Sequence, residues 1–162
     1  MDLSTRFMGL ALSSPFIAGA SGLTGDRDGV LRCVAAGAGA VVLKSLFEEQ
    51  ITAQVEALVA RSGEEVHPEA ADYIRRYGRE GAVARYLELI RECKREVPVP
   101  VVASVHCVSS GAWTQFAREV EQAGADALEL NVNVLTSDPR LTGPQMEQIG
   151  RASCRERVCY VV

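Results

Sequence analysis

The chain has 162 residues, 48% of them hydrophobic and 23% charged, which is typical of a globular domain with a buried core. With a formal net charge of −4 and no stripe of lysine and arginine, it is not expected to bind nucleic acid. It has no apolar run long enough to span a bilayer, no signal peptide and no CxxC pair among its five cysteines, so we expect a cytoplasmic protein with reduced thiols, no membrane segment and no metal site.

The chain opens with short extended elements that lead into a helix. Residues 3–12 alternate loosely around Met8-Gly9 and predict a hairpin. The compact apolar run 16–20 predicts a buried strand. After it, Asp26 can cap a helix whose apolar residues recur at helical spacing from Val30 onward.

The middle of the chain is predicted to be mainly helical. The apolar run 40–43 predicts a second strand, and the next strand does not begin until residue 101. Helical patterns lie between these strands at 48–61, 68–77 and 81–96. The polar stretch that joins the first two of these patterns is predicted to be an exposed loop over one end of the fold.

The next predicted elements are a strand, a helix and a strand. Residues 101–105 predict the third strand. The helix after it carries Trp113, Phe116 and Val120 on one face, and we expect Trp113 to lie in the core. Residues 127–131 predict the fourth strand.

Helices and buried strands alternate, which is typical of parallel βαβ units. The helices before the second and fourth strands end in similar phrases, around Gly37 and Gly124, where glycine supplies a left-handed C-cap. The choice is between a doubly wound sheet and a barrel, and the absence of a GxGxxG fingerprint after the first strand favours the barrel. Because a TIM (β/α)8 barrel needs about 250 residues, the predicted fold is α/β, the truncated N-terminal half of such a barrel with about four βα units.

The character of the sequence changes near the C-terminus. Residues 149–158, IGRASCRERV, have neither helical nor strand periodicity, and they resemble the translation of a common short-read sequencing adapter. The alternative is an unusual basic C-terminal arm. We therefore expect a partial barrel over residues 1–148 and an artefactual tail over residues 149–162.

In a barrel of this kind, active-site groups lie at the C-terminal ends of the strands. Those ends carry Ala20-Ser21-Gly22, Lys44-Ser45 and Asn131. Small residues let a flat ligand approach the backbone, the lysine offers a positive charge, and the asparagine offers both a donor and an acceptor. Together they suit a polar, electron-rich heterocycle. The alternatives are a plain turn at Ser21-Gly22, a solvated charge at Lys44 and a loop cap at Asn131.

Other polar residues near the strand ends are weaker candidates. His67 and His106 have no obvious acidic partner in the sequence, so neither is expected to be catalytic. Because side chains alternate along a strand, Glu129 is expected to point to the same side as Asn131. A charge inside a barrel is costly unless it is paired, so we expect Lys44 or a residue from the missing half to neutralise Glu129.

The segments at these strand ends resemble, in the same order, those of the dihydroorotate dehydrogenase family. They are Ala20-Ser21-Gly22, Val42-Leu43-Lys44-Ser45 and ADALELN at 125–131. The stretch 103–113 is similar to the flavin domain of dihydropyrimidine dehydrogenase. The resemblance covers residues 1–148 and points to the bacterial dihydroorotate dehydrogenase-like group.

The resemblance implies an FMN-dependent oxidoreductase of pyrimidine metabolism, acting on CH–CH groups of a dihydroorotate- or dihydropyrimidine-like small molecule. Ala20, Ser21 and Gly22 would line the isoalloxazine of FMN. Lys44, with Ser45 beside it, would lie near the pyrimidine edge, and Lys44 and Asn131 would also contact substrate. A cation there stabilises the reduced, anionic flavin. The full-length parent is expected to be a homo-oligomer, and the fragment alone is expected to be inactive.

The family pattern is incomplete after the fourth strand. The family run Asn-x-Ser-Cys-Pro-Asn is replaced by NVNVLT at 131–136, which puts Val134 at the position of the catalytic cysteine. Valine cannot transfer a proton, so the catalytic residue is unknown. Cys107 is a candidate replacement, with a buried bystander thiol as the alternative. Two other functions stay open: a flavin-free barrel lyase or synthase, and a non-catalytic FMN-binding barrel.

Overall fold

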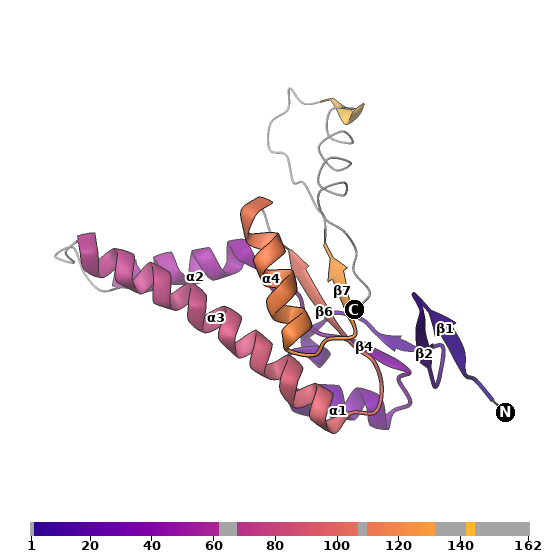
Figure 1. Cartoon of the computed structure of the whole chain (residues 1–162). Helices are drawn as coiled ribbons and strands as arrows, with labels where there is room; N and C mark the ends of the chain where they lie inside the picture. Colours follow the sequence, from indigo (N-terminus) through magenta and orange to yellow (C-terminus); the bar gives the residue numbers. More distant parts are fainter. Residues whose placement is uncertain (1, 62–67, 107–109, 132–141, 145–162) are drawn as a thin grey trace.

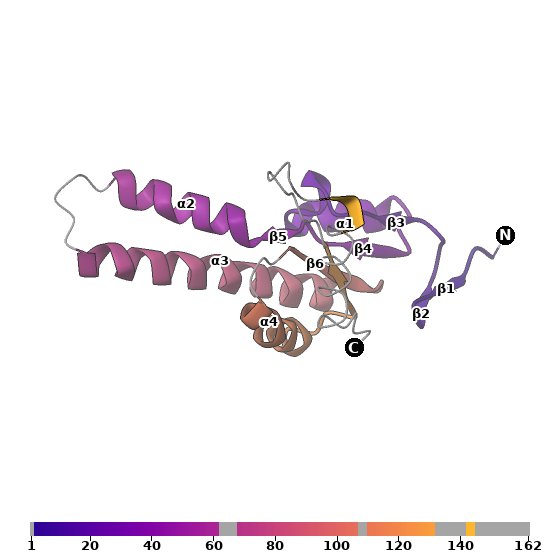
Figure 2. The same ribbon diagram turned by 90° about the horizontal axis from the view of Figure 1, so that it is seen from above.

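A computed structural model describes residues 2–61, 68–106, 110–131 and 142–144 of the chain. They form a mixed α/β fold in which helices pack on a mostly parallel sheet and a helical hairpin projects beyond it (Figures 1 and 2). The predicted α/β class is therefore confirmed.

The N-terminal hairpin forms as predicted. Strand β1 (Thr5–Phe7) pairs antiparallel with β2 (Leu10–Leu12). The turn between them has positive φ at both central residues, 50° at Met8 and 80° at Gly9, as a type I′ hairpin turn requires. This hairpin stands to the side of the main sheet (Figure 1).

The main sheet consists of parallel strands that are neighbours in chain order. β3 (Ile17–Ala18) pairs with β4 (Ala40–Val42), β4 pairs with β6 (Val101–His106), and β6 pairs with β7 (Ala127–Leu130). A short strand that the sequence did not predict, β5 (Leu46–Phe47), also pairs with β6. It lies on the edge that β4 occupies, beyond the end of β4, so β4 and β5 act as one interrupted partner of β6.

The predicted buried strand at 16–20 is wrong in its burial. The paired segment is only β3, and Phe16 and Ile17 are 69% and 38% exposed. The reason is position: among the described residues β3 pairs only with β4, so it is an edge strand with one open side.

Three helices pack on one face of the sheet: α1 (Arg27–Ala35), α3 (Pro68–Glu96) and α4 (Ser110–Gln122). Helix α1 begins after Asp26, whose carboxylate accepts the N–H of Gly29 at 2.7 Å. The chain turns after α1 and α4 at Gly37 and Gly124, where φ is 98° and 93°. The predicted helix cap at Asp26 and the predicted left-handed turns are confirmed.

Helices α2 (Glu48–Arg61) and α3 run side by side as a hairpin that extends away from the sheet (Figure 2). The two patterns predicted at 68–77 and 81–96 form the single helix α3. Gly78, between them, faces α2: a Cβ there would stand 2.6 Å from a methyl carbon of Val55. This glycine lets two helices approach closely without ending the helix. Among the described residues, no helix is both long and apolar enough to cross a membrane.

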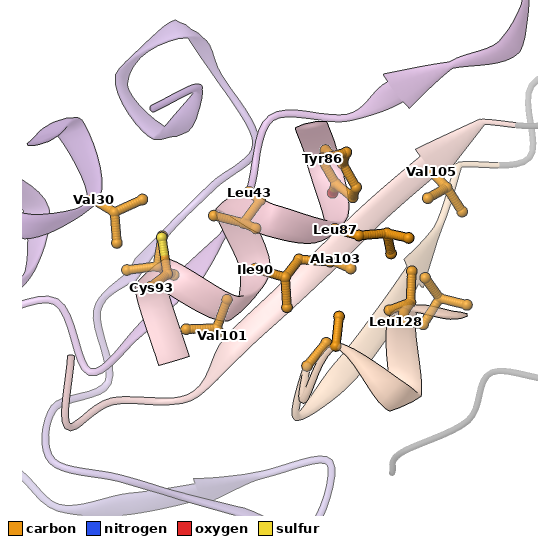
Figure 3. Close-up of a cluster of buried hydrophobic side chains, with 14 of the residues drawn as sticks. Val30, Leu43, Tyr86, Leu87, Ile90, Cys93, Val101, Ala103, Val105 and Leu128 are labelled. Atoms are coloured by element: carbon orange, nitrogen blue, oxygen red, sulfur yellow. The ribbon is translucent and has the colours of Figure 1, made fainter. Parts of the chain in front are cut away.

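The core lies between the sheet and the helices α1, α3 and α4 (Figure 3). Alternate strand residues point into it, namely Val41, Leu43, Val101, Ala103, Val105 and Leu128. We call this side of the sheet the helix face. The residues between them, such as Ser104 and Glu129, lie on the opposite side, the cavity face. The side chain of Trp113 lies outside the described part of the structure, so its place in the core stays a prediction.

Candidate functional site

A cavity of about 470 Å³ opens on the cavity face, at the C-terminal ends of the strands. This volume is in the range of small-molecule sites, about 300–1,000 Å³. The cavity is lined by Ala20, Ser21, Gly22, Lys44, Ser45, Phe47, Glu129 and Asn131. The structure thus brings together all the residues that the sequence singled out for cofactor binding, with Glu129, which was predicted to face the same side, and it adds Phe47.

The loop after β3 is held in place by Thr24, which is fully buried. The Thr24 hydroxyl accepts the N–H of Ser21 at 3.2 Å, and the Ser21 hydroxyl accepts the N–H of Leu23 at 3.3 Å. These bonds close a capping box on the short 3-10 helix η1 (Gly22–Thr24). The Thr24 carbonyl then accepts the N–H of Lys44 at 3.1 Å, so the loops after β3 and β4 are joined directly.

Two glycines allow this loop to pack closely. A Cβ on Gly29 would stand 2.0 Å from the carbonyl oxygen of Leu23, and a Cβ on Gly25 would stand 3.2 Å from Cδ of Lys44. The stem of Lys44 therefore lies against the backbone of Gly25. Sequence reasoning missed both glycines, and Thr24 with them, because their importance comes from contacts with another segment.

Strand β4 departs from β6 where the site begins. The N–H of Leu43 still donates to the carbonyl of Val102 at 2.9 Å, and pairing resumes only at Leu46. In an uninterrupted parallel pair, the carbonyl of Leu43 would accept the N–H of Ser104, and the N–H of Ser45 would donate to the carbonyl of Ser104. The detour turns Lys44 and Ser45 out of the ladder, and both line the cavity.

Tyr86 of α3 fills the break in the ladder. Its hydroxyl donates to the carbonyl of Ser104 at 3.0 Å and accepts the N–H of Ser104 at 2.8 Å. One phenol thus satisfies both backbone groups that the departing strand would have paired. Burial raises the pKa of Tyr86 far above its ordinary value, so the hydroxyl keeps its proton.

A chain of hydrogen bonds crosses the cavity face from β7 to the loop after β4. The Ser104 hydroxyl, fully buried, donates to Oε1 of Glu129 at 2.6 Å. The hydroxyls of Ser104 and Ser45 lie 2.7 Å apart. The side chains of three residues from separate strands or loops therefore form one hydrogen-bonded chain, in the order Ser45, Ser104 and Glu129.

The predicted direction of Glu129 is confirmed and its predicted pairing with Lys44 is not, while neutralisation by a residue from the missing half stays a prediction. Glu129 points to the same cavity as Asn131 and Lys44, as the alternation along β7 required. However, the ion pairs of the described residues do not include one between Lys44 and Glu129. The carboxylate is exposed and is held by the Ser104 hydroxyl. In the described residues the charge is in contact with water, which lowers the cost of leaving it without a cation.

The ends of β6 and β7 complete the site. The ring of His106 is buried and stacks on Phe47, with centroids 5.4 Å apart and an interplanar angle of 30°. The N–H of Asn131 donates to the carbonyl of Val105 at 2.8 Å, which continues the ladder to the edge of the cavity. His106 thus packs beside the cavity; that it is not catalytic stays a prediction.

Several predicted features lie outside the described residues: His67, Cys107, Val134, the run after Asn131 and the tail 149–162. Within the described residues, no three His, Cys, Asp or Glu side chains gather in a way that could hold a metal ion. No protein-family model matches the sequence of the chain.

Proposed function

We propose that the chain is the N-terminal part of an FMN-dependent oxidoreductase that acts on CH–CH groups of a dihydroorotate- or dihydropyrimidine-like substrate. The observation that carries this proposal is the convergence of Ala20-Ser21-Gly22, Lys44-Ser45 and Asn131 on one cavity. These segments are far apart in the chain and meet because each follows a parallel strand of the same sheet.

The proposed architecture is the first half of a (β/α)8 barrel. Its support is the order of the parallel strands β3, β4, β6 and β7, together with helices on one face of the sheet. A doubly wound sheet carries helices on both faces and reverses its strand order. In a barrel, the cavity face is the interior, and sites lie at the C-terminal ends of the strands.

The lining residues fit a flavin. Ala20 and Gly22 are small and exposed, and a Cβ on Gly22 would meet nothing within 4 Å, so a flat ring system can approach the backbone here. Lys44 offers a positive charge and Asn131 both a donor and an acceptor to the polar edge of the ring. Flavin, when bound, supplies hydride and electron transfer. The residues of the chain bind the ring, orient it and favour its anionic reduced form through Lys44.

The first experiment measures flavin binding. It uses the longer protein that we propose contains this chain as its N-terminal part, without the tail 149–162, and we call it the source protein. We expect saturable quenching of FMN fluorescence, and a Lys44→Met variant with about tenfold weaker binding, because a charge-assisted contact is lost. Arg76→Met, which removes an equal charge from an exposed position on α3, is the matched control. A source protein that binds no FMN contradicts the proposal and favours a flavin-free barrel lyase or synthase.

The second experiment separates an enzyme from a non-catalytic flavin barrel. The flavin-loaded source protein is mixed anaerobically with dihydroorotate or with dihydrouracil, and the visible flavin absorption is followed. We expect bleaching, because oxidation of the CH–CH group gives a hydride from one carbon to the flavin and a proton from the neighbouring carbon to a side chain or to water. A holoprotein whose absorption persists with both compounds is a binding module, not an oxidoreductase.

A further inference from the structure

In the wall of the cavity, the donor and the acceptor of each hydrogen bond between Ser45, Ser104 and Glu129 can be assigned by counting the available hydrogens. The carboxylate of Glu129 can only accept. The 2.6 Å contact between Ser104 Oγ and Glu129 Oε1 therefore uses the single hydroxyl hydrogen of Ser104.

That assignment determines the role of Ser45. Because the hydrogen of Ser104 is already engaged, the 2.7 Å contact between the two serine hydroxyls requires Ser45 to be the donor. The hydrogen of Ser45 then points into the sheet, and only its lone pairs remain for the cavity. The position of Ser104 is fixed from the helix side of the sheet, because its N–H and its carbonyl are both hydrogen-bonded to the hydroxyl of Tyr86.

We propose that Ser45 and Glu129 form an acceptor pair that selects a ligand carrying an N–H next to a carbonyl oxygen, with the carbonyl facing Lys44. Ser45, Glu129 and Lys44 all line the same cavity. This is the chemistry of a cyclic imide or ureide. The inference rests on the proposed function, since that chemistry occurs both in the pyrimidine-dione ring of a flavin and in a free pyrimidine substrate.

The selection has a physical basis. The N–H of such a ligand restores a hydrogen bond that this acceptor pair loses when water leaves the cavity. A ligand in which that nitrogen is methylated leaves the acceptors unpaired, and sites built around hydrogen bonds reject such ligands strongly.

The test compares two pairs of ligands on the source protein. One pair is FMN and FMN methylated at the imide nitrogen, followed by flavin fluorescence. The other is uracil and dimethyluracil, in which both ring N–H groups are methylated, followed by calorimetry. We expect the methylated member of at least one pair to bind about tenfold more weakly. The pair that shows the loss identifies the source of the N–H.

The outcomes separate this inference from the proposed function. FMN binding with equal affinity within both pairs overturns the inference and leaves the proposed function intact. Absence of FMN binding, with uracil still preferred over dimethyluracil, overturns the proposed function and supports the acceptor pair. Failure to bind any of the four ligands overturns both.

Variants test whether the Ser104 hydroxyl enforces the polarity. In Ser104→Ala, the hydroxyl of Ser45 is released and can donate to the cavity while Glu129 still only accepts, so we expect the preference for the N–H ligand to fall. Glu80→Gln, on an exposed part of α3, should keep the full preference. The ratio of two affinities is unaffected by a change in the folded fraction, which both ligands share. If Ser104→Ala does not fold, Ser45→Ala is used instead, because it removes one acceptor of the pair. An unchanged preference for the N–H ligand over its methylated partner, in whichever variant folds, overturns the inference.

Discussion

The two faces of the sheet are made by the same strands and have opposite chemistry. On the helix face, Val41, Val101 and Val105 are 0% exposed and pack against apolar helix residues. On the cavity face, Ser104 and Glu129 are joined by a hydrogen bond beside an open cavity. Because side chains alternate along a strand, each strand contributes to both faces. The comparison indicates that the free energy of folding comes mainly from one face, while the proposed ligand site lies on the other.

Tyr86 belongs to both regions. Its ring is part of the apolar core on α3, and its hydroxyl bonds to the backbone of Ser104 at the break in the ladder. It is therefore the residue through which a change in the core is expected to reach the cavity.

The largest expected effect is the loss of a core side chain from the helix face. Ile90 on α3 is fully buried, so Ile90→Ala should lower the free energy of unfolding by about 2–5 kcal/mol. The measurement is denaturant unfolding followed by circular dichroism. Leu58→Ala, at a half-exposed position on α2, should cost less than about 0.5 kcal/mol. Equal costs for the two variants would contradict the assignment of stability to the helix face.

The next effect comes from the hydroxyl that joins the two faces. Tyr86→Phe leaves the N–H and carbonyl of Ser104 without their partner, which should cost about 1–3 kcal/mol of unfolding free energy. Ligand affinity should fall as well, because Ser104 no longer has a fixed backbone. Tyr77→Phe removes an exposed hydroxyl from the same helix and should change neither quantity. A stable Tyr86→Phe protein would show that water replaces the phenol.

A comparable effect is expected where the loop after β3 packs on α1. The added methyl group of Gly29→Ala would meet the Leu23 carbonyl at 2.0 Å, so the loop has to move, at a cost of about 1–3 kcal/mol. Ligand binding should weaken because this loop carries Ser21 and Gly22. Gly81→Ala on α3 is the control: its nearest contact would be 3.5 Å away, and alanine should stabilise the helix by about 0.5–1 kcal/mol. The measurements are denaturant unfolding and ligand titration of both variants. A Gly29→Ala protein as stable as the Gly81→Ala protein would contradict the close packing of the loop on α1.

The smallest effect concerns the Cys93 thiol in the core. Burial raises the pKa of Cys93 from 9.0 to about 11, with nearby Glu92 and Glu96 adding to the shift. The folded protein therefore holds this proton more tightly than the unfolded chain. The contribution to stability is complete below pH 9 and is lost as the pH rises through about 11.

Alkylation with iodoacetamide, mapped by mass spectrometry, checks the thiol. At pH 8 we expect the half-buried Cys33 to be modified and the buried Cys93 to be protected. In unfolding experiments, the loss of stability between pH 9 and pH 11 should shrink in Cys93→Ala. Rapid modification of Cys93 at pH 8 would mean that this part of the core opens readily.

Much of the architecture follows from local sequence patterns. The cap at Asp26 and the glycines at 37 and 124 mark helix ends through backbone conformations that depend on those residues alone. The strand-end residues could be grouped in advance, because parallel strands place their carboxyl ends at the same edge of a sheet. The exposed Phe16 was mispredicted because an apolar run carries no information on whether its strand lies at an edge.

The arrangement within the cavity depends on packing between distant segments. Periodicity tells which side of a strand Glu129 faces, but not that Ser104 lies opposite it in the register of β6 and β7. Nor does any local pattern show that β4 leaves its ladder at Lys44, or that Tyr86 from a separate helix takes its place. Local patterns encode backbone conformation and the side toward which a residue points. Which side chain a residue contacts in the cavity is decided only when the helices and strands pack together, because these contacts join residues far apart in the chain.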